Sequence, residues 1–252
     1  MDYVWNEKTL AWFKVASAHT GFHANLARLV RPLIADCETI CDVGCGLGLL
    51  DLELAQDVRD ILCVDRNEAA IGALNELLRA RGTRNVVARA MDANALVGER
   101  WDAAIMSFFG SSLEDIARFL TLCDKRMILI VHEKSSTGRR VNAISLRAKP
   151  FGAAEVSGFL SERGLRFRET RAALEFGQPF KSLADARDFI RTYASLASHA
   201  ASAADEAAWE RLCEDMERRL ARTGRADYPL YLPKRKNLAV FAVEKSAIRD
   251  LS

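Results

Sequence analysis

The sequence has no apolar run long enough to cross a membrane and no strong excess of charge of either sign. A membrane-spanning helix needs about 18 consecutive apolar residues. The N-terminal segment carries acidic residues and lacks the continuous apolar stretch of a secretory signal. The formal net charge of the 252 residues is only +2, which gives no reason to expect nucleic acid or an anionic membrane as the main partner. We therefore expect a cytoplasmic protein without a membrane-spanning segment.

The six cysteines form no CxxC pair, and no cluster of further ligands follows them at zinc spacing. The alternative is a metal site formed by Cys37, Cys41 and Cys45. However, Cys41 and Cys45 flank the junction between an expected strand and a glycine turn. We expect reduced, mostly buried thiols and no metal site.

The sequence does contain a regular alternation of strand-like and helix-like segments, and half of its residues are hydrophobic (50%), which is enough for a sizeable core. Such alternation predicts an α/β fold with a parallel sheet covered by helices on both faces. Short β-rich runs lie at 39–43, 60–65, 85–90, 101–108 and 126–133. The helices between them are expected at 47–56, at 67–81 and from a cap at Ser111 or Ser112 to Cys123.

The segments on either side depart from this alternation. Two amphipathic helices, at 5–18 and 22–34, are separated by Thr20-Gly21. After the polar stretch 134–149, a helix (153–163), a long strand (165–176) and a last strand (236–245) are expected. Residues 182–223 look helical, in two helices broken near 198–204, and lie between those two strands. We predict an N-terminal helical cap (1–36) and a main domain (37–252) with a helical insertion (182–223).

The most informative segment reads DVGCGLG, from Asp42 to Gly48, after a strand and before a helix. Its glycines let the backbone turn tightly and a ligand approach closely, and the following helix N-terminus offers free N–H groups. The dinucleotide fingerprint would place its third glycine at Leu49, and the Gly-Lys-Ser/Thr of a phosphate loop is absent.

This D-x-G-x-G-x-G segment resembles the first motif of the class I S-adenosylmethionine-dependent methyltransferases, and the resemblance covers about residues 38–133. The later strand ends agree with it: Asp65 ends the second strand, Asp92 follows the third, and Ser107-Phe108-Phe109 ends the fourth. The resemblance implies a doubly wound, Rossmann-like sheet of seven mostly parallel strands and S-adenosyl-L-methionine as cofactor.

In that family the acid at Asp65 faces the ribose hydroxyls, the acid at Asp92 faces the adenine amine, and the fourth strand end lies near the methyl group. Carried over residue by residue, the resemblance implies a cofactor-binding set: Asp42, Gly44, Cys45, Gly46, Gly48, Asp65, Arg66, Met91, Asp92, Ala93, Ser107 and Phe108.

The reaction implied is an in-line, metal-independent methyl transfer that depends on proximity and alignment, so the sequence does not declare the acceptor. The fourth strand end, Ser107 to Gly110, lacks the marks of three subclasses: nucleic-acid amino methylation, cytosine-C5 methylation and magnesium-dependent catechol methylation. A small-molecule acceptor is the leading hypothesis. Candidate bases or orienting groups, if one is used, are His19, His23, His132 and Tyr231.

Two alternatives stay open. The first is a methyltransferase that acts on RNA or a protein, favoured only by a local basic patch: Arg218, Arg219, Arg222, Arg225, Lys234, Arg235 and Lys236. The second is a binding protein with a methyltransferase fold and no catalysis, which the intact glycines and Asp65 disfavour. Arg139, Arg140 and Arg147 are candidate anion-recognition residues for an acceptor, and the oligomeric state is left open.

Overall fold

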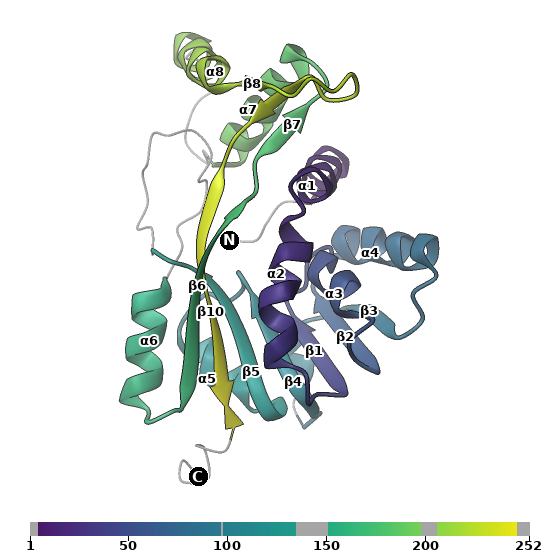
Figure 1. Ribbon diagram of the computed structural model, residues 1–252, viewed down its shortest axis with the longest axis vertical. Helices are drawn as coiled ribbons and strands as arrows, with labels where there is room; N and C mark the ends of the chain where they lie inside the picture. Colours follow the sequence, from purple (N-terminus) through teal and green to yellow (C-terminus); the bar gives the residue numbers. More distant parts are fainter. Residues whose placement is uncertain (1–4, 97, 135–150, 198–205, 246–252) are drawn as a thin grey trace.

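The structure, a computed structural model, describes residues 5–96, 98–134, 151–197 and 206–245. Its centre is a sheet in the order β3-β2-β1-β4-β5-β10-β6 (Figure 1). All neighbours are parallel except β10, which runs antiparallel to β5 and β6. The strands in chain order are β1 (Thr39–Val43), β2 (Asp60–Asp65), β3 (Val86–Ala90), β4 (Trp101–Ser107), β5 (Cys123–His132), β6 (Phe167–Glu175) and β10 (Arg235–Glu244). The prediction of a seven-stranded, mostly parallel, doubly wound α/β fold is confirmed.

Helices cover both faces of this sheet because successive strand side chains point to opposite sides. Ile40 and Ile61 face one side, and Cys41 and Leu62 face the other. The first face packs against α2 (Phe22–Val30), α3 (Leu49–Leu54) and α4 (Glu68–Arg81). The second face packs against α5 (Glu114–Leu120) and α6 (Ala153–Glu162).

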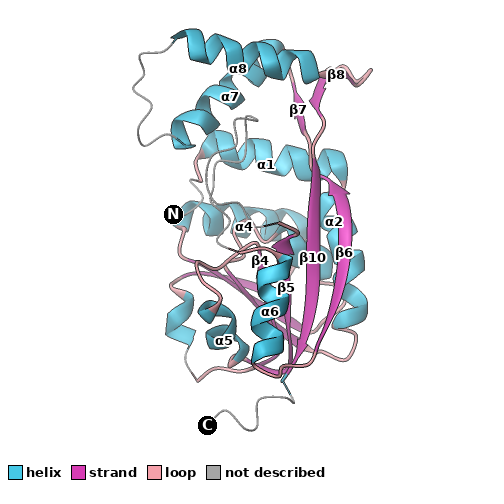
Figure 2. Cartoon of the chain, turned by 90° about the vertical axis from the view of Figure 1, so that its left-hand side faces the viewer, coloured by secondary structure: helices cyan, strands magenta, loops and turns pink. Residues whose placement is uncertain are grey.

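Beyond the sheet, β6 and β10 lead into a smaller unit, which we call the cap (Figures 1 and 2). The cap is a three-stranded sheet in the order β7-β9-β8 with two helices. Its core includes Phe180, Phe189 and Met216. The cap elements are β7 (Gln178–Phe180), α7 (Leu183–Ala197), α8 (Glu206–Arg219), β8 (Ala221–Arg222) and β9 (Leu230–Leu232). Strands on both sides of the helical segment 182–223 therefore take part in the same small unit.

The first helix, α1 (Glu7–Thr20), packs against the cap. The Trp12 indole donates a hydrogen bond to Asp185 Oδ1 (3.0 Å), and Lys8 Nζ lies 2.6 Å from Asp188 Oδ2. The Trp12 ring also belongs to the cap core. Gly21, at φ +63°, separates α1 from α2, so the two N-terminal helices serve different parts of the fold.

Two local predictions differ from the structure. The helix expected at 47–56 is only Leu49–Leu54, because Gly48 takes a left-handed conformation (φ +57°). Neither Ser111 nor Ser112 caps α5; instead both donate backbone N–H groups to the Asp115 carboxylate, at 2.7 and 3.1 Å. The predicted caps are wrong because the acid inside the helix binds the preceding turn. Most of the segment 134–149 lies outside the described residues.

The cysteines behave as expected for thiols of a hydrophobic core. None of the six forms a disulfide; five are buried and Cys45 is partly exposed. Burial raises the pKa of Cys37 and Cys123 to about 11, so both thiols stay protonated near neutral pH. Within the described ranges, no helix has the length and apolar character that a membrane span requires.

Candidate active site

The glycine loop between β1 and α3 forms one side of the site. Gly44, Gly46 and Gly48 all have positive φ (+75°, +57° and +57°), a region that side chains with a Cβ rarely adopt. A Cβ on Gly44 would lie 2.0 Å from a ring carbon of Phe109, and one on Gly48 would lie 2.6 Å from Leu74 Cδ2. The glycines are therefore required both by the turn and by the side chains packed on it.

Asp65 ends β2 directly beside this loop. Its Oδ2 accepts a hydrogen bond from the Gly46 N–H and its Oδ1 accepts one from the Asn67 N–H, each at 2.9 Å. A carboxylate offers about four lone-pair directions, so two backbone donors leave acceptor capacity for two hydroxyls. The arrangement fits a ribose diol next to the loop, with Arg66 as the adjoining residue.

Trp5 covers the outer side of the loop. A Cβ on Gly46 would meet the Trp5 ring at 3.2 Å, and the same ring packs edge-on against Phe13 of α1, with centroids 5.3 Å apart. Asn6, the next residue, forms a capping box with Thr9 and so fixes where α1 begins. The expected helix at 5–18 includes Trp5, but no local pattern indicates its place against Gly46.

Three phenylalanine rings surround a lysine at the carboxyl ends of β4 and β6. Lys236 Nζ lies 4.9 Å from the ring centroid of Phe22, 5.0 Å from that of Phe108 and 4.0 Å from that of Phe176. We call these three rings the phenylalanine cage. The faces of aromatic rings attract cations, so this end of the site is built to hold positive charge. Phe108 has φ +53°, which is costly for a bulky residue and typical of functional sites.

The histidine candidates fall into two groups, and the first lies at the phenylalanine cage. The ring centroids of His132 and Phe108 are 4.6 Å apart, and those of His23 and Phe22 are 5.0 Å apart. His23 Nδ1 is 2.6 Å from Ser17 Oγ. Burial, and to a smaller extent the charge of Lys236, lower the pKa of His23 to about 3. His23 is therefore a neutral imidazole at physiological pH.

The second group lies where the main sheet meets the cap. The ring centroids of His19 and Tyr231 are 4.9 Å apart, and the two rings are tilted by 34°. The Tyr231 hydroxyl donates to Glu175 Oε1 at 2.6 Å. Burial and this hydrogen bond raise the pKa of Tyr231 above its usual range. Tyr231 thus ties β9 to the end of β6, a structural contact that sequence reasoning did not anticipate.

The predicted adenine-side residues follow β3 as expected from the sequence. Asp92 is exposed, and its Oδ1 accepts hydrogen bonds from the backbone N–H and side-chain amide of Asn94, both at 2.8 Å. Met91 and Ala93 are partly buried against the core on the α5 side of the sheet. Ser107 is the last residue of β4, next to the strained Phe108.

Beneath the loop lie two fully buried acids. The side chain of Asp42 is 1% exposed and that of Asp51, on α3, is 0% exposed. In the part of the chain that the structure describes, Asp42 Oδ1 and both oxygens of Asp51 have no hydrogen-bond partner. Asp51 was not among the predicted site residues. The available signal was an acid at a core position of an apolar helix, between Leu50 and Leu54.

The remaining candidates do not join this site. Arg218 pairs with Asp215, and Arg225 pairs with Asp227, so the basic patch is partly neutralised. Arg139, Arg140 and Arg147 lie outside the described residues.

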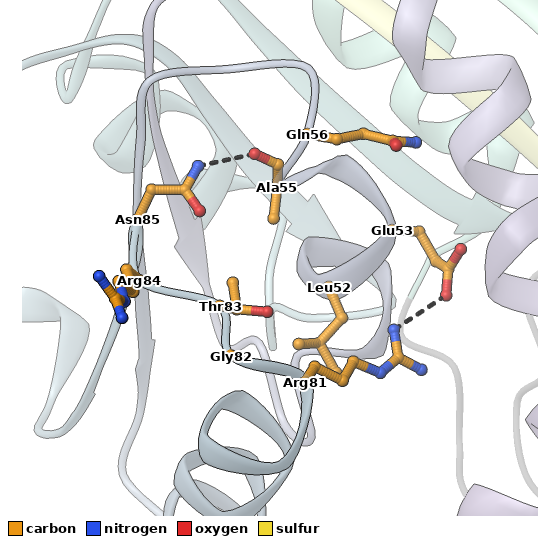
Figure 3. Close-up of a pocket in the computed structure, with 9 residues that line it drawn as sticks. All are labelled: Leu52, Glu53, Ala55, Gln56, Arg81, Gly82, Thr83, Arg84 and Asn85. Carbon is orange, nitrogen blue, oxygen red and sulfur yellow. Dashed lines mark hydrogen bonds and ion pairs between the residues drawn. The ribbon is translucent and has the colours of Figure 1, made fainter.

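A surface depression of about 370 Å³ lies at the amino ends of β2 and β3 (Figure 3). It is lined by residues from the end of α3 and the α4–β3 turn, and Arg81 in its wall pairs with Glu53 at 3.3 Å. It is therefore on the opposite edge of the sheet from the glycine loop. No group of three or more His, Cys, Asp or Glu side chains suited to a metal occurs among the residues described. Metal independence stays a prediction.

The sheet order and the glycine loop after β1 are those of a Rossmann-like, doubly wound α/β fold, in which ligands bind at the carboxyl ends of the strands. Comparison with family models makes this specific: residues 40–126 match the model of a methyltransferase domain. None of the curated proteins matches the chain.

Solved structures resemble most of the chain in fold. YcgJ from Bacillus subtilis aligns at a TM-score of 0.58 and 13% identity, covering 87% of this chain and 97% of its own. Magnesium protoporphyrin IX methyltransferase from Synechocystis PCC 6803, crystallised with SAH, aligns at 0.51 and 17% identity, covering 96% and 89%. The [4+2]-cyclase SpnF aligns at 0.53 and 20% identity, covering 88% and 80%. The likeness concerns the fold, and proteins of one fold can catalyse different reactions, as this methyltransferase and this cyclase do.

Proposed function

We propose that this protein binds S-adenosylmethionine and transfers its methyl group to a small-molecule acceptor. The observation that carries the proposal is the meeting of Asp65 with the glycine loop, where the carboxylate already accepts the Gly46 N–H. The methyltransferase-domain match over residues 40–126 supports the same cofactor. When bound, the cofactor supplies a sulfonium-activated methyl group.

The chain would hold this cofactor with three features. The left-handed glycines let it approach the backbone, the free acceptor capacity of Asp65 fits the ribose hydroxyls, and Trp5 covers the loop from outside. Asp92 and its apolar neighbours Met91 and Ala93 stand on the neighbouring strand end, where we propose the adenine binds. Cys45, Gly48 and Arg66 complete the proposed lining.

We propose that the acceptor binds between the phenylalanine cage, the N-terminal helices and the cap. A cofactor over the ends of β1 to β3 directs its reactive end toward β4, which ends at Ser107 and Phe108. The cage around Lys236 accommodates positive charge there. Covering this region with α1 and the cap excludes water from the transfer, which the open sheet edge cannot do alone.

We propose that the residues near the acceptor serve more to orient it than to remove a proton from it. His23 is a neutral imidazole and a very weak base, because its pKa is lowered to about 3. It therefore suits a role in orienting an acceptor. His132 remains the candidate base, since it borders the strained Phe108 at the strand end. Tyr231 and His19 lie at the junction of the main sheet and the cap, where we propose that they position the cap.

Calorimetric titration with S-adenosylmethionine and S-adenosylhomocysteine tests the cofactor. We expect dissociation constants in the micromolar range, about −8 kcal/mol. Absence of binding would favour a non-catalytic binding protein instead. For the acceptor, salt-dependent RNA binding by the purified chain would favour the macromolecular alternative. Turnover of a small molecule that falls when the cap segment 182–223 is shortened, with cofactor affinity retained, would support the proposed site.

A further inference from the structure

The two buried acids beneath the glycine loop present an electrostatic problem. Asp42 belongs to β1 and Asp51 to α3, and both side chains are shielded from solvent. Three of their four oxygens find no donor in the described chain. Two ionised carboxylates cannot share an apolar site, because their repulsion and desolvation oppose ionisation of both. One of the two must hold a proton.

The surroundings of the pair agree. Burial raises the pKa of Asp42 well above its usual range, and the nearby charge of Asp51 raises it further. Burial also raises the pKa of Asp51. The titratable groups acting on the pair are the thiols Cys45 and Cys63 and the carboxylate of Asp65, and none of these brings a positive charge. With one proton between them, the pair carries one negative charge below the loop.

We propose that Asp51 is a positioning residue that holds a shared proton against Asp42, so that the pair is a buried counter-charge favouring the sulfonium cofactor over its neutral sulfide product. The inference rests on the proposed function. S-adenosylmethionine carries one more positive charge than S-adenosylhomocysteine, and both would lie on the outer face of the loop. A single charge in a low-dielectric site therefore affects the two ligands differently.

Two substitutions at Asp51 separate charge from structure. In Asp51→Asn the amide donates to Asp42, which stays ionised, so the negative charge is kept without a shared proton. In Asp51→Leu, Asp42 stands alone among apolar groups and binds a proton, so the charge is lost. Glu53→Gln, on the same helix but facing Arg81, is the matched control.

The readout is the ratio of the dissociation constants for S-adenosylhomocysteine and S-adenosylmethionine, measured by calorimetry. We expect Asp51→Leu to lower this preference for S-adenosylmethionine about tenfold, and Asp51→Asn and Glu53→Gln to keep it within about twofold. An unchanged ratio in Asp51→Leu would overturn the proposal.

A second measurement needs no cofactor and covers the case in which Asp51→Leu does not fold. Infrared spectra of the wild-type protein without cofactor, at about pH 7, should show a protonated carboxyl band. The band should be absent from the spectrum of Asp51→Asn. Absence of that band in the wild-type protein overturns the shared proton, whatever the ligands do. If the band is present but neither ligand binds, the proposed function fails and the counter-charge role fails with it.

Discussion

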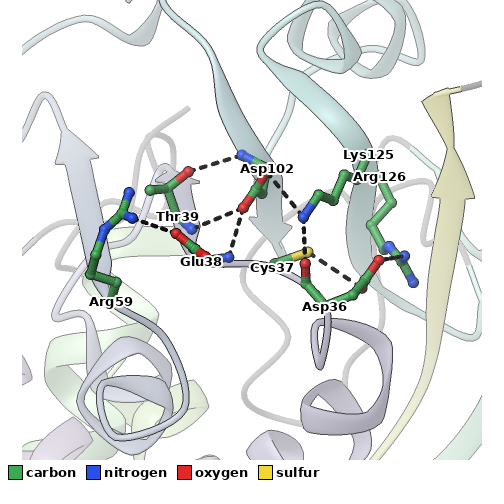
Figure 4. A network of polar contacts seen from close by, with 8 residues as sticks. All are labelled: Asp36, Cys37, Glu38, Thr39, Arg59, Asp102, Lys125 and Arg126. Carbon is green, nitrogen blue, oxygen red and sulfur yellow. Dashed lines mark hydrogen bonds and ion pairs between the residues drawn. The ribbon is translucent and has the colours of Figure 1, made fainter.

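The two edges of the central sheet handle charge in opposite ways. At the amino ends of the strands, Asp102 accepts hydrogen bonds from the Glu38 and Thr39 N–H groups, and its carboxylate pairs with Lys125 (Figure 4). Arg126 pairs with Asp36 at 2.6 Å in the same network. At the carboxyl ends, by contrast, Asp42 and Asp51 are buried with unpaired oxygens.

The difference separates residues that stabilise the fold from residues that we propose bind a ligand. At the amino edge the carboxylates of Asp36 and Asp102 are paired with cations and reach solvent, although the buried Nε of Arg126 has no partner in the described chain. At the carboxyl edge the chain keeps left-handed glycines, a strained Phe108 and buried acids, each unfavourable to the folded chain alone. Such costs are typical of functional sites.

The largest expected effect is from a side chain on the loop. Gly46→Val should weaken S-adenosylmethionine binding more than about hundredfold, roughly 3 kcal/mol, because the side chain enters the space between the loop and Trp5. Gly82→Val is the control: its φ is similarly positive (+66°) but its Cβ would meet nothing within 4 Å. Both variants should lose some stability in urea titrations, whereas only the first should lose binding in calorimetry. Equal binding by both variants would show that the loop is not part of the cofactor site.

A smaller effect distinguishes carboxylates at the two edges. Asp65→Ala should weaken cofactor binding by about 2–4 kcal/mol through the loss of two charge-assisted hydrogen bonds to hydroxyls. Asp102→Ala, at the other edge, should leave the dissociation constant unchanged. Calorimetry on both variants decides the matter, and unchanged binding in Asp65→Ala would refute the proposed place of the ribose.

The same Asp102 variant should instead affect stability. Asp102→Ala should cost about 1–2 kcal/mol in urea unfolding, because two backbone N–H groups lose their acceptor. Partial burial acts to raise the pKa of Asp102, but hydrogen bonds from Glu38 and Lys125 outweigh it and lower that pKa. The stabilisation is therefore complete above the unfolded value of about 3.9 and is lost as the pH falls through the lower folded value. A wild-type and variant difference that persists in stronger acid would contradict this assignment.

Trp5 should have a weaker effect on the cofactor edge. Trp5→Ala should weaken S-adenosylmethionine binding by about 1 kcal/mol, because one aromatic wall is removed. Trp209→Ala on α8 should leave binding unchanged, since its ring contacts Arg191 in the cap. Calorimetric titration of both variants tests this, and an equal loss in both would point to a general effect of the cap.

The smallest expected effect is that of metal removal. Methyl transfer should keep its full rate after exhaustive chelation, because alignment of the acceptor with the activated methyl group needs no Lewis acid. The rate before and after chelation, with the cofactor concentration held constant, is the measurement. Activity that returns only with added magnesium or zinc would show that a metal takes part.

Much of the cofactor edge was predictable because its signals are local. Strand, glycine turn and helix follow one another within a few residues around Gly44, and Asp65 stands at the next strand end. In parallel sheets such ends meet at one edge. The caps of α5 were predicted wrongly because Asp115, inside the helix, accepts the backbone N–H groups of Ser111 and Ser112, and neither serine lies at the N-cap position.

The sequence by itself determined the alternation of elements, the two-faced sheet and the glycine loop with its acids, since hydrophobic period and turn residues act over short distances. Only the tertiary structure decided which distant side chains meet. It joined Lys236 to Phe22, Phe108 and Phe176, and it packed α3 so that Asp51 faces Asp42. These contacts depend on how helices pack across strands far apart in the chain, and no local pattern encodes that packing.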